Sequence, residues 1–501
     1  MRLPNNNKRR LWILVMQVGL LILLWSPYAA GIVKLGESAT LLTPTRIGGA
    51  NGKNDQRDAD IYPAVAYDSV SKRYLVVWLS GRNANSSSDG LDVYGRFLND
   101  SGQPIGAEFR ISDSNTAARN GFPAIVAGNG EFVVVWTAKA GWCRIQAQRI
   151  TDTSAQADKT LVTSSSLHLH SPALTYHPTR QRYALAYVSG DDYLPPTLFG
   201  ASTSDCANNA ASVSQLKATE FYFSGNTPSV GTPLNLSDTA GGAFRPGLAF
   251  SSSQNGYLAV WEDRRSAAGQ QYRFDVYAQR LSSTLTKSGA NTVLHTGGNY
   301  SDNQNGSTTW TPRPAVTGGN RFLATWFTYQ NQGAGKIWSV YGQRISLNGS
   351  VLTKSLIAEA TFAETHTTPP TGFLVGSYNG SSQEHIVALS SHLESIWGYL
   401  SSVRIQRVDS NGNLVDNSGS ISYQAGVGNS IDYANDDQIG VNLAINPLSN
   451  YGKSTDYLVV YSKHAPGKPS QDFDIWNTII RLPVSSATSK QVYIPIVTKR
   501  R

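Results

Sequence analysis

The 501-residue sequence has few sulfur-containing side chains: two cysteines and two methionines. Two cysteines, Cys143 and Cys206, cannot form a disulfide framework, although in an exported chain they can pair with each other. The alternative is a buried strand residue and a loop thiol, and the sequence leaves both open. Both methionines, Met1 and Met16, lie in the N-terminal segment.

Charged residues are also scarce, at 15%, and the formal net charge of +8 comes from the two ends of the chain. The body between them has equal numbers of basic and acidic residues. This excludes a basic groove for phosphates, so we expect no nucleic-acid partner. The terminal basic residues are Arg2, Lys8, Arg9, Arg10, Lys490, Lys499, Arg500 and Arg501.

One apolar run stands out, from Leu11 to Trp25, and it is short for a membrane-spanning helix. A basic stretch precedes it and small residues follow it, which predicts a signal peptide over residues 1–31. The alternative is an uncleaved anchor, which would be the chain's one contact with a membrane. No cysteine lies near the cleavage point, so lipid anchoring is disfavoured.

Glycine (45 residues), tyrosine (24) and small polar residues are abundant, a composition typical of many short strands. A unit of four apolar, β-rich runs recurs along the chain. Its first copy reads YPAVAY (62–67), RYLVVW (73–78), DVYGRFL (92–98) and EFRIS (108–112). Six further copies begin near residues 122, 171, 245, 313, 371 and 440, and the third and sixth of the seven units depart most from the pattern. The fourth strand of the sixth unit is expected at SISYQ (420–424).

The seventh copy has no clear fourth strand, whereas TPTRIGG (43–49) is a fourth strand without a unit. A chain with this arrangement is built to close on itself, so we predict an all-β β-propeller. It has seven four-stranded blades over residues 40–482, with the N-terminal strand completing the last blade. Residues 483–501 are expected to form a C-terminal tail with a basic end.

These repeats resemble those of exported bacterial propellers with P-A-V-A-Y, Y-L-V-V-W and D-x-Y-x-Q-R-L strands, a class that is mostly uncharacterised. The resemblance covers residues 40–482 and implies architecture, not activity. The recurring aromatic at the end of six of the seven second strands predicts packing between blades. Recurring Arg and Asp residues on the third strands predict ion pairs or capped turns.

Several motifs are rejected as sites. SDNQNGSTTW (301–310) lacks the Ser, Asp and Gly of a sialidase Asp-box, and DSNGNLVD (409–416) lacks the Gly and Glu of a calcium loop. His168 and His170 share one face of an extended segment, but no acidic or cysteine ligand is close in sequence. We therefore expect no metal site and no cofactor, calcium being allowed but supported by no motif.

The loops that join second to third strands are the long ones, and they share a face with the loops that enter the first strands. Function commonly lies on long loops held by a rigid scaffold. Aromatic, acidic and Arg side chains there suit sugars, so the candidate ligand-binding residues are Tyr62, Phe122, Asp191, Asp192, Glu262, Asp263, Arg264, Trp310 and Trp338.

Taken together, these features predict a monomeric, secreted or cell-surface protein. The first hypothesis is a non-catalytic scaffold that binds glycan or protein on the long-loop face. The alternative is an extracellular glycan-active hydrolase with carboxylates in the central funnel, which would need two of them in proximity. A third is a structural surface-layer component. No catalytic residue can be assigned from the sequence.

Overall fold

A computed structural model gives the architecture of the chain. It describes residues 40–41, 45–49, 60–82, 91–113, 119–152, 159–190, 206, 214–238, 242–266, 274–297, 314–331, 335–352, 354–363, 372–380, 382–395, 398–415, 441–446, 454–464, 473–483 and 492–495. The expected signal peptide lies outside these residues. Within them, no helix has the length and apolar character needed to cross a bilayer.

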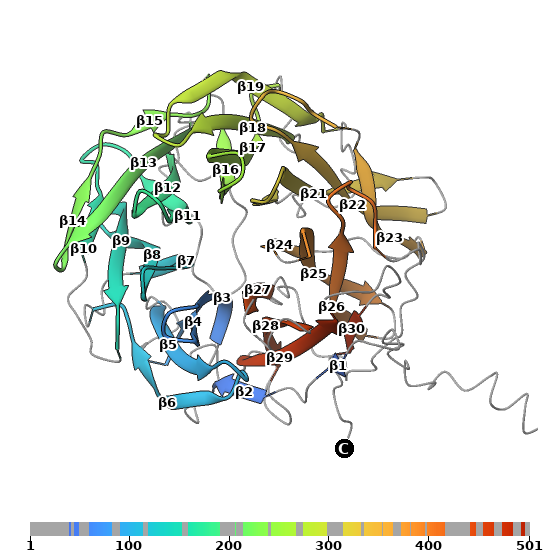
Figure 1. Ribbon diagram of the computed structural model, residues 1–501, viewed down its shortest axis with the longest axis horizontal. Helices are drawn as coiled ribbons and strands as arrows, with labels where there is room; N and C mark the ends of the chain where they lie inside the picture. Colours follow the sequence, from blue (N-terminus) through green and yellow to red (C-terminus); the bar gives the residue numbers. More distant parts are fainter. Residues whose placement is uncertain are drawn as a thin grey trace, which may run out of the picture.

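The described residues form seven antiparallel sheets arranged as blades in a ring, which confirms the predicted β-propeller (Figure 1). The first blade contains β3 (Asp60–Asp68), β4 (Arg73–Ser80), β5 (Asp92–Asn99) and β6 (Pro104–Arg110). The second contains β7 (Arg119–Gly128), β8 (Glu131–Ala140), β9 (Trp142–Ile150) and β10 (Lys159–Val162). The third contains β11 (Leu169–His177), β12 (Arg182–Ser189), β13 (Gln215–Ser224), β14 (Thr227–Val230) and β15 (Leu234–Asn235).

The next four blades complete the ring. The fourth contains β16 (Ala243–Ser251), β17 (Gly256–Asp263), β18 (Asp275–Ser282) and β19 (Lys287–His295), and the fifth contains β20 (Ala315–Thr317), β21 (Phe322–Asn331), β22 (Gly335–Ile345) and β23 (Ser355–Ala363). The sixth contains β24 (Gly372–Asn379), β25 (Glu384–Ser395), β26 (Gly398–Val408) and β30 (Val492–Pro495). The seventh contains β27 (Val441–Asn446), β28 (Ser454–His464), β29 (Phe473–Pro483), β1 (Thr40–Leu41) and β2 (Thr45–Gly48).

The first strand of each blade lies nearest the centre of the ring (Figure 1). Each of these inner strands contacts the inner strand of the next blade, and β27 contacts β3. Because every first strand starts on the same face, that face also carries the connections from second to third strands. We call it the long-loop face.

The N-terminal strand closes the ring, as predicted. β2 pairs with β29, so residues from the start of the chain form the outer edge of the seventh blade. An ion pair of 2.7 Å between Arg46 and Asp474 lies at the same seam. Closure therefore combines strand pairing with a charge contact.

The outer strand of the sixth blade comes from an unforeseen part of the chain. The sequence suggested residues 420–424 for it, and these lie outside the described residues. Instead β30, from the segment expected to be a tail, pairs with β26 through Val403 and Ile494. Both ends of the described chain thus complete blades.

The recurring tryptophans confirm the prediction of packing between blades. Trp78, Trp136, Trp261 and Trp326 are fully buried. Each belongs to a cluster with apolar residues of the preceding blade, as Trp261 does with Ala184 and Leu216. Removing such a side chain typically costs roughly 3–5 kcal/mol, so these positions hold the ring together.

The recurring third-strand arginines are structural as well. Arg407 and Arg481 pair with Glu384 and Asp456 at the start of the second strand of their own blade, at 2.7 and 2.8 Å. Others bond to the next blade, as Arg280 does to the Leu347 carbonyl at 2.9 Å. The repeated strand therefore joins each blade internally and to its neighbour.

Candidate functional site

The inner strands of the first four blades carry the same irregularity near the long-loop face. In each, two residues on the first strand oppose one on the second, which is a β-bulge. The residues at these bulges precede a proline and are Tyr62, Phe122, Ser171 and Arg245. Bulges of this kind re-aim a side chain and are common beside active sites.

Backbone conformation at the bulge also recurs. Tyr62, Ser171 and Arg245 have φ of 52°, 53° and 45°, in the left-handed region that side chains other than glycine rarely adopt. The strands that carry all four bulges contact one another in order around the ring. The fold therefore conserves the bulge while the side chain changes from blade to blade, which is the pattern expected of a site on a repeating scaffold. We refer to these four as the bulge positions.

A buried ion pair occupies the bulge of the fourth blade. Arg245 Nη1 lies 2.7 Å from Glu262 Oε2, and the carboxylate side chain is 0% exposed while that of Arg245 is 19% exposed. The position after the second-strand aromatic is Leu79, Thr137 or Val188 in the first three blades. A charge in this slot is costly to bury unless it is paired, so Glu262 is an exception that the repeat itself does not explain.

A second buried carboxyl group lies at the same end of the first blade. Asp60 is 2% exposed and precedes the bulge by two residues, a slot that holds Asn120, Leu169 and Ala243 in the next three blades. Burial raises the pKa of Asp60 to about 7, although Arg82, 3.2 Å away, opposes the shift. Asp60 is thus a carboxyl group that retains a proton close to neutral pH.

The other described candidates from the sequence have identifiable partners. Asp263 accepts a 2.7 Å hydrogen bond from Trp261 Nε1 and forms an ion pair with Arg265 at 2.6 Å, which fixes the fourth blade rather than a ligand. Arg264 is half-buried, with its guanidinium 5.6 Å from the ring centre of Phe274. The structure therefore brings Glu262 into contact with Arg245, one of the bulge positions, and assigns Asp263 to the framework.

Three predicted site residues, Asp191, Asp192 and Trp310, lie outside the described residues. For Phe122 and Trp338 the structure describes the strands that carry them, β7 and β22.

The sequence-based reasoning missed Asp60, Arg245 and Ser171. Comparing the repeats slot by slot would have found Asp60, because the equivalent positions of the next three blades are uncharged, whereas Arg245 recurs as Arg313 in the fifth blade. The bulge itself had no such signal beyond the proline that follows it, since register is a property of paired strands.

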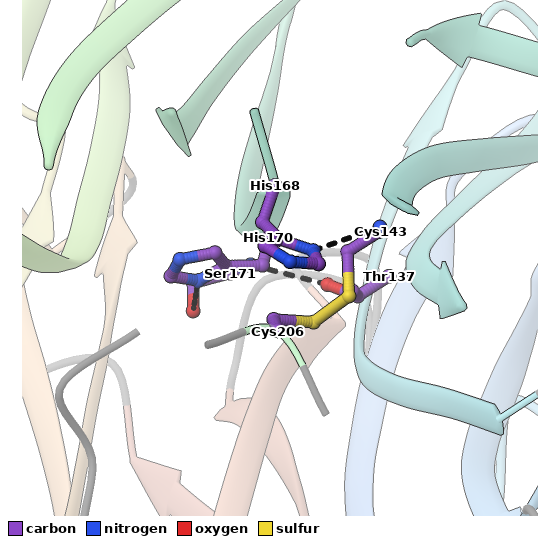
Figure 2. Close-up of a disulfide and its surroundings, with 6 residues drawn as sticks. All are labelled: Thr137, Cys143, His168, His170, Ser171 and Cys206. Atoms are coloured by element: carbon purple, nitrogen blue, oxygen red, sulfur yellow. Dashed lines mark hydrogen bonds between the residues drawn. A yellow bond between two sulfur atoms is a disulfide. The ribbon is translucent and has the colours of Figure 1, made fainter. Parts of the chain in front are cut away.

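His170 and Ser171 form a polar cluster at the bulge of the third blade (Figure 2). His170 Nδ1 lies 3.0 Å from Ser171 Oγ, and the Ser171 amide donates to Thr137 Oγ1 at 3.1 Å. Burial and the neighbouring His168 lower the pKa of His170 to about 3, so its imidazole is neutral at physiological pH. The cluster ties the third blade to the second.

Of the two alternatives left open for the cysteines, the structure contains the disulfide. Cys143 on β9 bonds to Cys206 in the connection between β12 and β13, and the Cys143 amide donates to His168 Nδ1 at 3.1 Å (Figure 2). These three residues place potential metal ligands within 4.8 Å of one another, but both sulfurs belong to the disulfide. In the described part of the chain, this group is therefore a crosslink rather than an open ligand set.

No protein-family model matches the chain, and no curated protein is similar to it in sequence. Solved structures share its fold at low identity. A mutant Trypanosoma rangeli sialidase with trans-sialidase activity is 11% identical over 75% of this chain, with a TM-score of 0.36. An exo-1,5-alpha-L-arabinanase from a bovine ruminal metagenomic library is 11% identical over 61% of this chain and 99% of its own, with a TM-score of 0.31.

A subtype N10 neuraminidase-like protein of A/little yellow-shouldered bat/Guatemala/060/2010 is 9% identical over 70% of this chain and 95% of its own, with a TM-score of 0.38. The match to the Trypanosoma rangeli sialidase spans 56% of that protein. No residue role passes to this chain from similarity at this level.

These comparisons correct the first functional hypothesis. The similar structures include a sialidase, an arabinanase, a family-43 glycoside hydrolase and an N-acetylgalactosamine deacetylase. Their names are those of carbohydrate-active enzymes, so the prediction of a non-catalytic scaffold is withdrawn, but similarity at this level gives this chain no activity. The chemistry has to be argued from the residues of this chain.

Proposed function

We propose that the protein is an exported glycan-active hydrolase with its reaction centre at the bulge positions on the long-loop face. The observation that carries this proposal is the presence of two buried carboxyl groups, Asp60 on the first blade and Glu262 on the fourth, and the scheme requires both to reach the same glycosidic bond. Both stand in slots that the neighbouring blades fill with uncharged residues. Ionisable groups in strongly perturbing surroundings concentrate at functional sites.

The two carboxyl groups suit different roles. Glycoside hydrolysis generally needs one carboxylic acid that protonates the leaving oxygen and one carboxylate that acts as base or nucleophile. Asp60 keeps its proton up to a pKa of about 7 and is assigned as the acid. Glu262 is held by an arginine and is assigned as the carboxylate. Environments that differ between two carboxyl groups are the usual basis of such a division.

Arg245 controls access to Glu262 in this scheme. Its guanidinium is partly exposed and covers the fully buried carboxylate. A glycan therefore meets Arg245 first and has to draw it away from Glu262 Oε2 before the carboxylate can react. Export is supported by the N-terminal apolar run and by the disulfide, which suits an oxidising compartment.

The test is hydrolysis of a panel of aryl glycosides and soluble polysaccharides by wild type, Asp60→Asn and Glu262→Gln. We expect each variant to lose at least about a hundredfold in kcat/KM, a typical effect of removing an acid or base. Asp68→Asn and Glu384→Gln are matched controls, because they alter a buried Asp and a paired Glu on the opposite face. Loss of the same size in the controls, or hydrolysis unaffected in Asp60→Asn and Glu262→Gln, would contradict the proposal.

A further inference from the structure

Trp142 is a large aromatic exposed on the long-loop face. It is the first residue of β9, follows the turn at Gly141 (φ 84°), and is 36% exposed. The tryptophans that end second strands are buried, and among the residues whose burial the structure describes Trp142 is the exposed indole. Leu167, also at this edge, is 39% exposed.

The second blade has the shortest connection on this face. Trp136 pairs with Gln146, ten positions further on, whereas Trp78 pairs with Tyr94, Trp326 with Tyr341 and Tyr187 with Lys217. The strand pair therefore turns close to the body of the blade and leaves Trp142 at its edge.

The indole is held in place from behind. The ring of buried His168 lies 4.7 Å from the Trp142 ring, centre to centre, at 51°. His168 is itself fixed by the hydrogen bond from the Cys143 amide, and Cys143 is anchored by its disulfide (Figure 2). Fixing an aromatic side chain before binding reduces the entropy lost on association.

We propose that Trp142 is a carbohydrate-binding platform that stacks on a sugar ring of a glycan chain extending from the reaction centre. The inference rests on the proposed function and names its substrate class: oligosaccharides or polysaccharides rather than single sugars. One indole beside one leucine matches the apolar face of one or two sugar rings. The apolar surface that these two side chains offer falls far short of the roughly 800 Å² per partner that is typical of a stable protein interface.

The test is affinity electrophoresis of the full chain in gels that contain arabinan, xylan, galactan, β-glucan, pullulan or polygalacturonate. Wild type should be retarded by at least one of these polymers. Trp142→Ala should weaken that retardation about tenfold, equivalent to about 1.4 kcal/mol, and Trp142→Phe should keep most of it. Tyr222→Ala is the matched control, because Tyr222 is 37% exposed on β13 at the opposite face, and it should behave as wild type.

Hydrolysis of short aryl glycosides by the same variants separates this inference from the proposed function. We expect Trp142→Ala to retain that activity while losing affinity for the polymer. Retention of full polymer affinity by Trp142→Ala, or no retardation of wild type by any polymer, would overturn the platform whether or not hydrolysis occurs. Retardation that depends on Trp142 without any hydrolysis would support the platform and count against the proposed reaction centre.

Discussion

Replacing both Cys143 and Cys206 by serine should lower the stability of the protein by about 4 kcal/mol. The disulfide closes a loop of 63 residues between the second and third blades. In the chain-entropy treatment, closing a loop of this length lowers the conformational entropy of the unfolded chain by about 14 cal/mol/K, which stabilises the folded protein by about 4 kcal/mol at 25 °C. With an unfolding entropy of about 2.1 cal/mol/K per residue, the corresponding fall in Tm is about 4 °C for a chain of this size.

The assay is differential scanning calorimetry of the wild type and the double serine variant, each with and without a dithiol reductant. Reductant should lower the Tm of wild type to near that of the variant and leave the variant unchanged. Ser164→Ala, in the exposed turn before β11, is a control for general loss of polar contacts. If the double variant melts with the wild type under oxidising conditions, the disulfide does not restrain the unfolded chain as argued here.

Three other outcomes follow from the structure. Between about pH 4 and pH 7 the unfolded state ionises Asp60 while the folded state keeps its proton, so the stability that this group contributes is complete at low pH and lost as pH rises through 7. The free energy of unfolding, measured by urea titration, should therefore fall by about 1.4 kcal/mol per pH unit from this group in wild type and not in Asp60→Asn. The same dependence on pH in both proteins would contradict the raised pKa. Trp261→Ala should lower the free energy of unfolding, measured by calorimetry, by roughly 3–5 kcal/mol, and Trp261→Phe should lower it less, because the indole fills the seam with the third blade. Equal losses of stability in the two variants would show that side-chain volume at this seam is unimportant. Ile494→Asp should destabilise the sixth blade and increase hydrogen exchange at Val403, its partner on β26; unchanged exchange would mean that β30 is dispensable.

The fold could be predicted from the sequence because propeller blades repeat both pattern and spacing. Trp78 and Trp136 recur at the same place in the strand pattern, and the seam each must fill follows from that recurrence. The orphan strand at 43–49 implied closure for the same reason. The outer strand of the sixth blade was out of reach because β30 pairs through four residues only, and so short a strand carries little pattern.

The candidate site was only partly predictable. Glu262 was identified as a carboxylate on the correct face, but its partner Arg245 depends on a bulge that appears only once two strands are paired. Asp60 was missed because its distinctive property, a raised pKa, comes from burial rather than from residue type. Asp263, of the same type and adjacent to Glu262, belongs to the framework, since strand alternation points it to the other side.

The closing strand also has a kinetic consequence. Arg46 and Asp474 are separated by 428 positions, so bringing β2 to β29 costs about 5 kcal/mol of chain entropy before any contact there is gained. Contacts of such long range form late, and folding dominated by them is slow. Until then the edge of β29 lacks its partner, and unpaired strand edges promote association between chains. The rate at which the ring closes should therefore limit the concentration at which this protein can be refolded without aggregation.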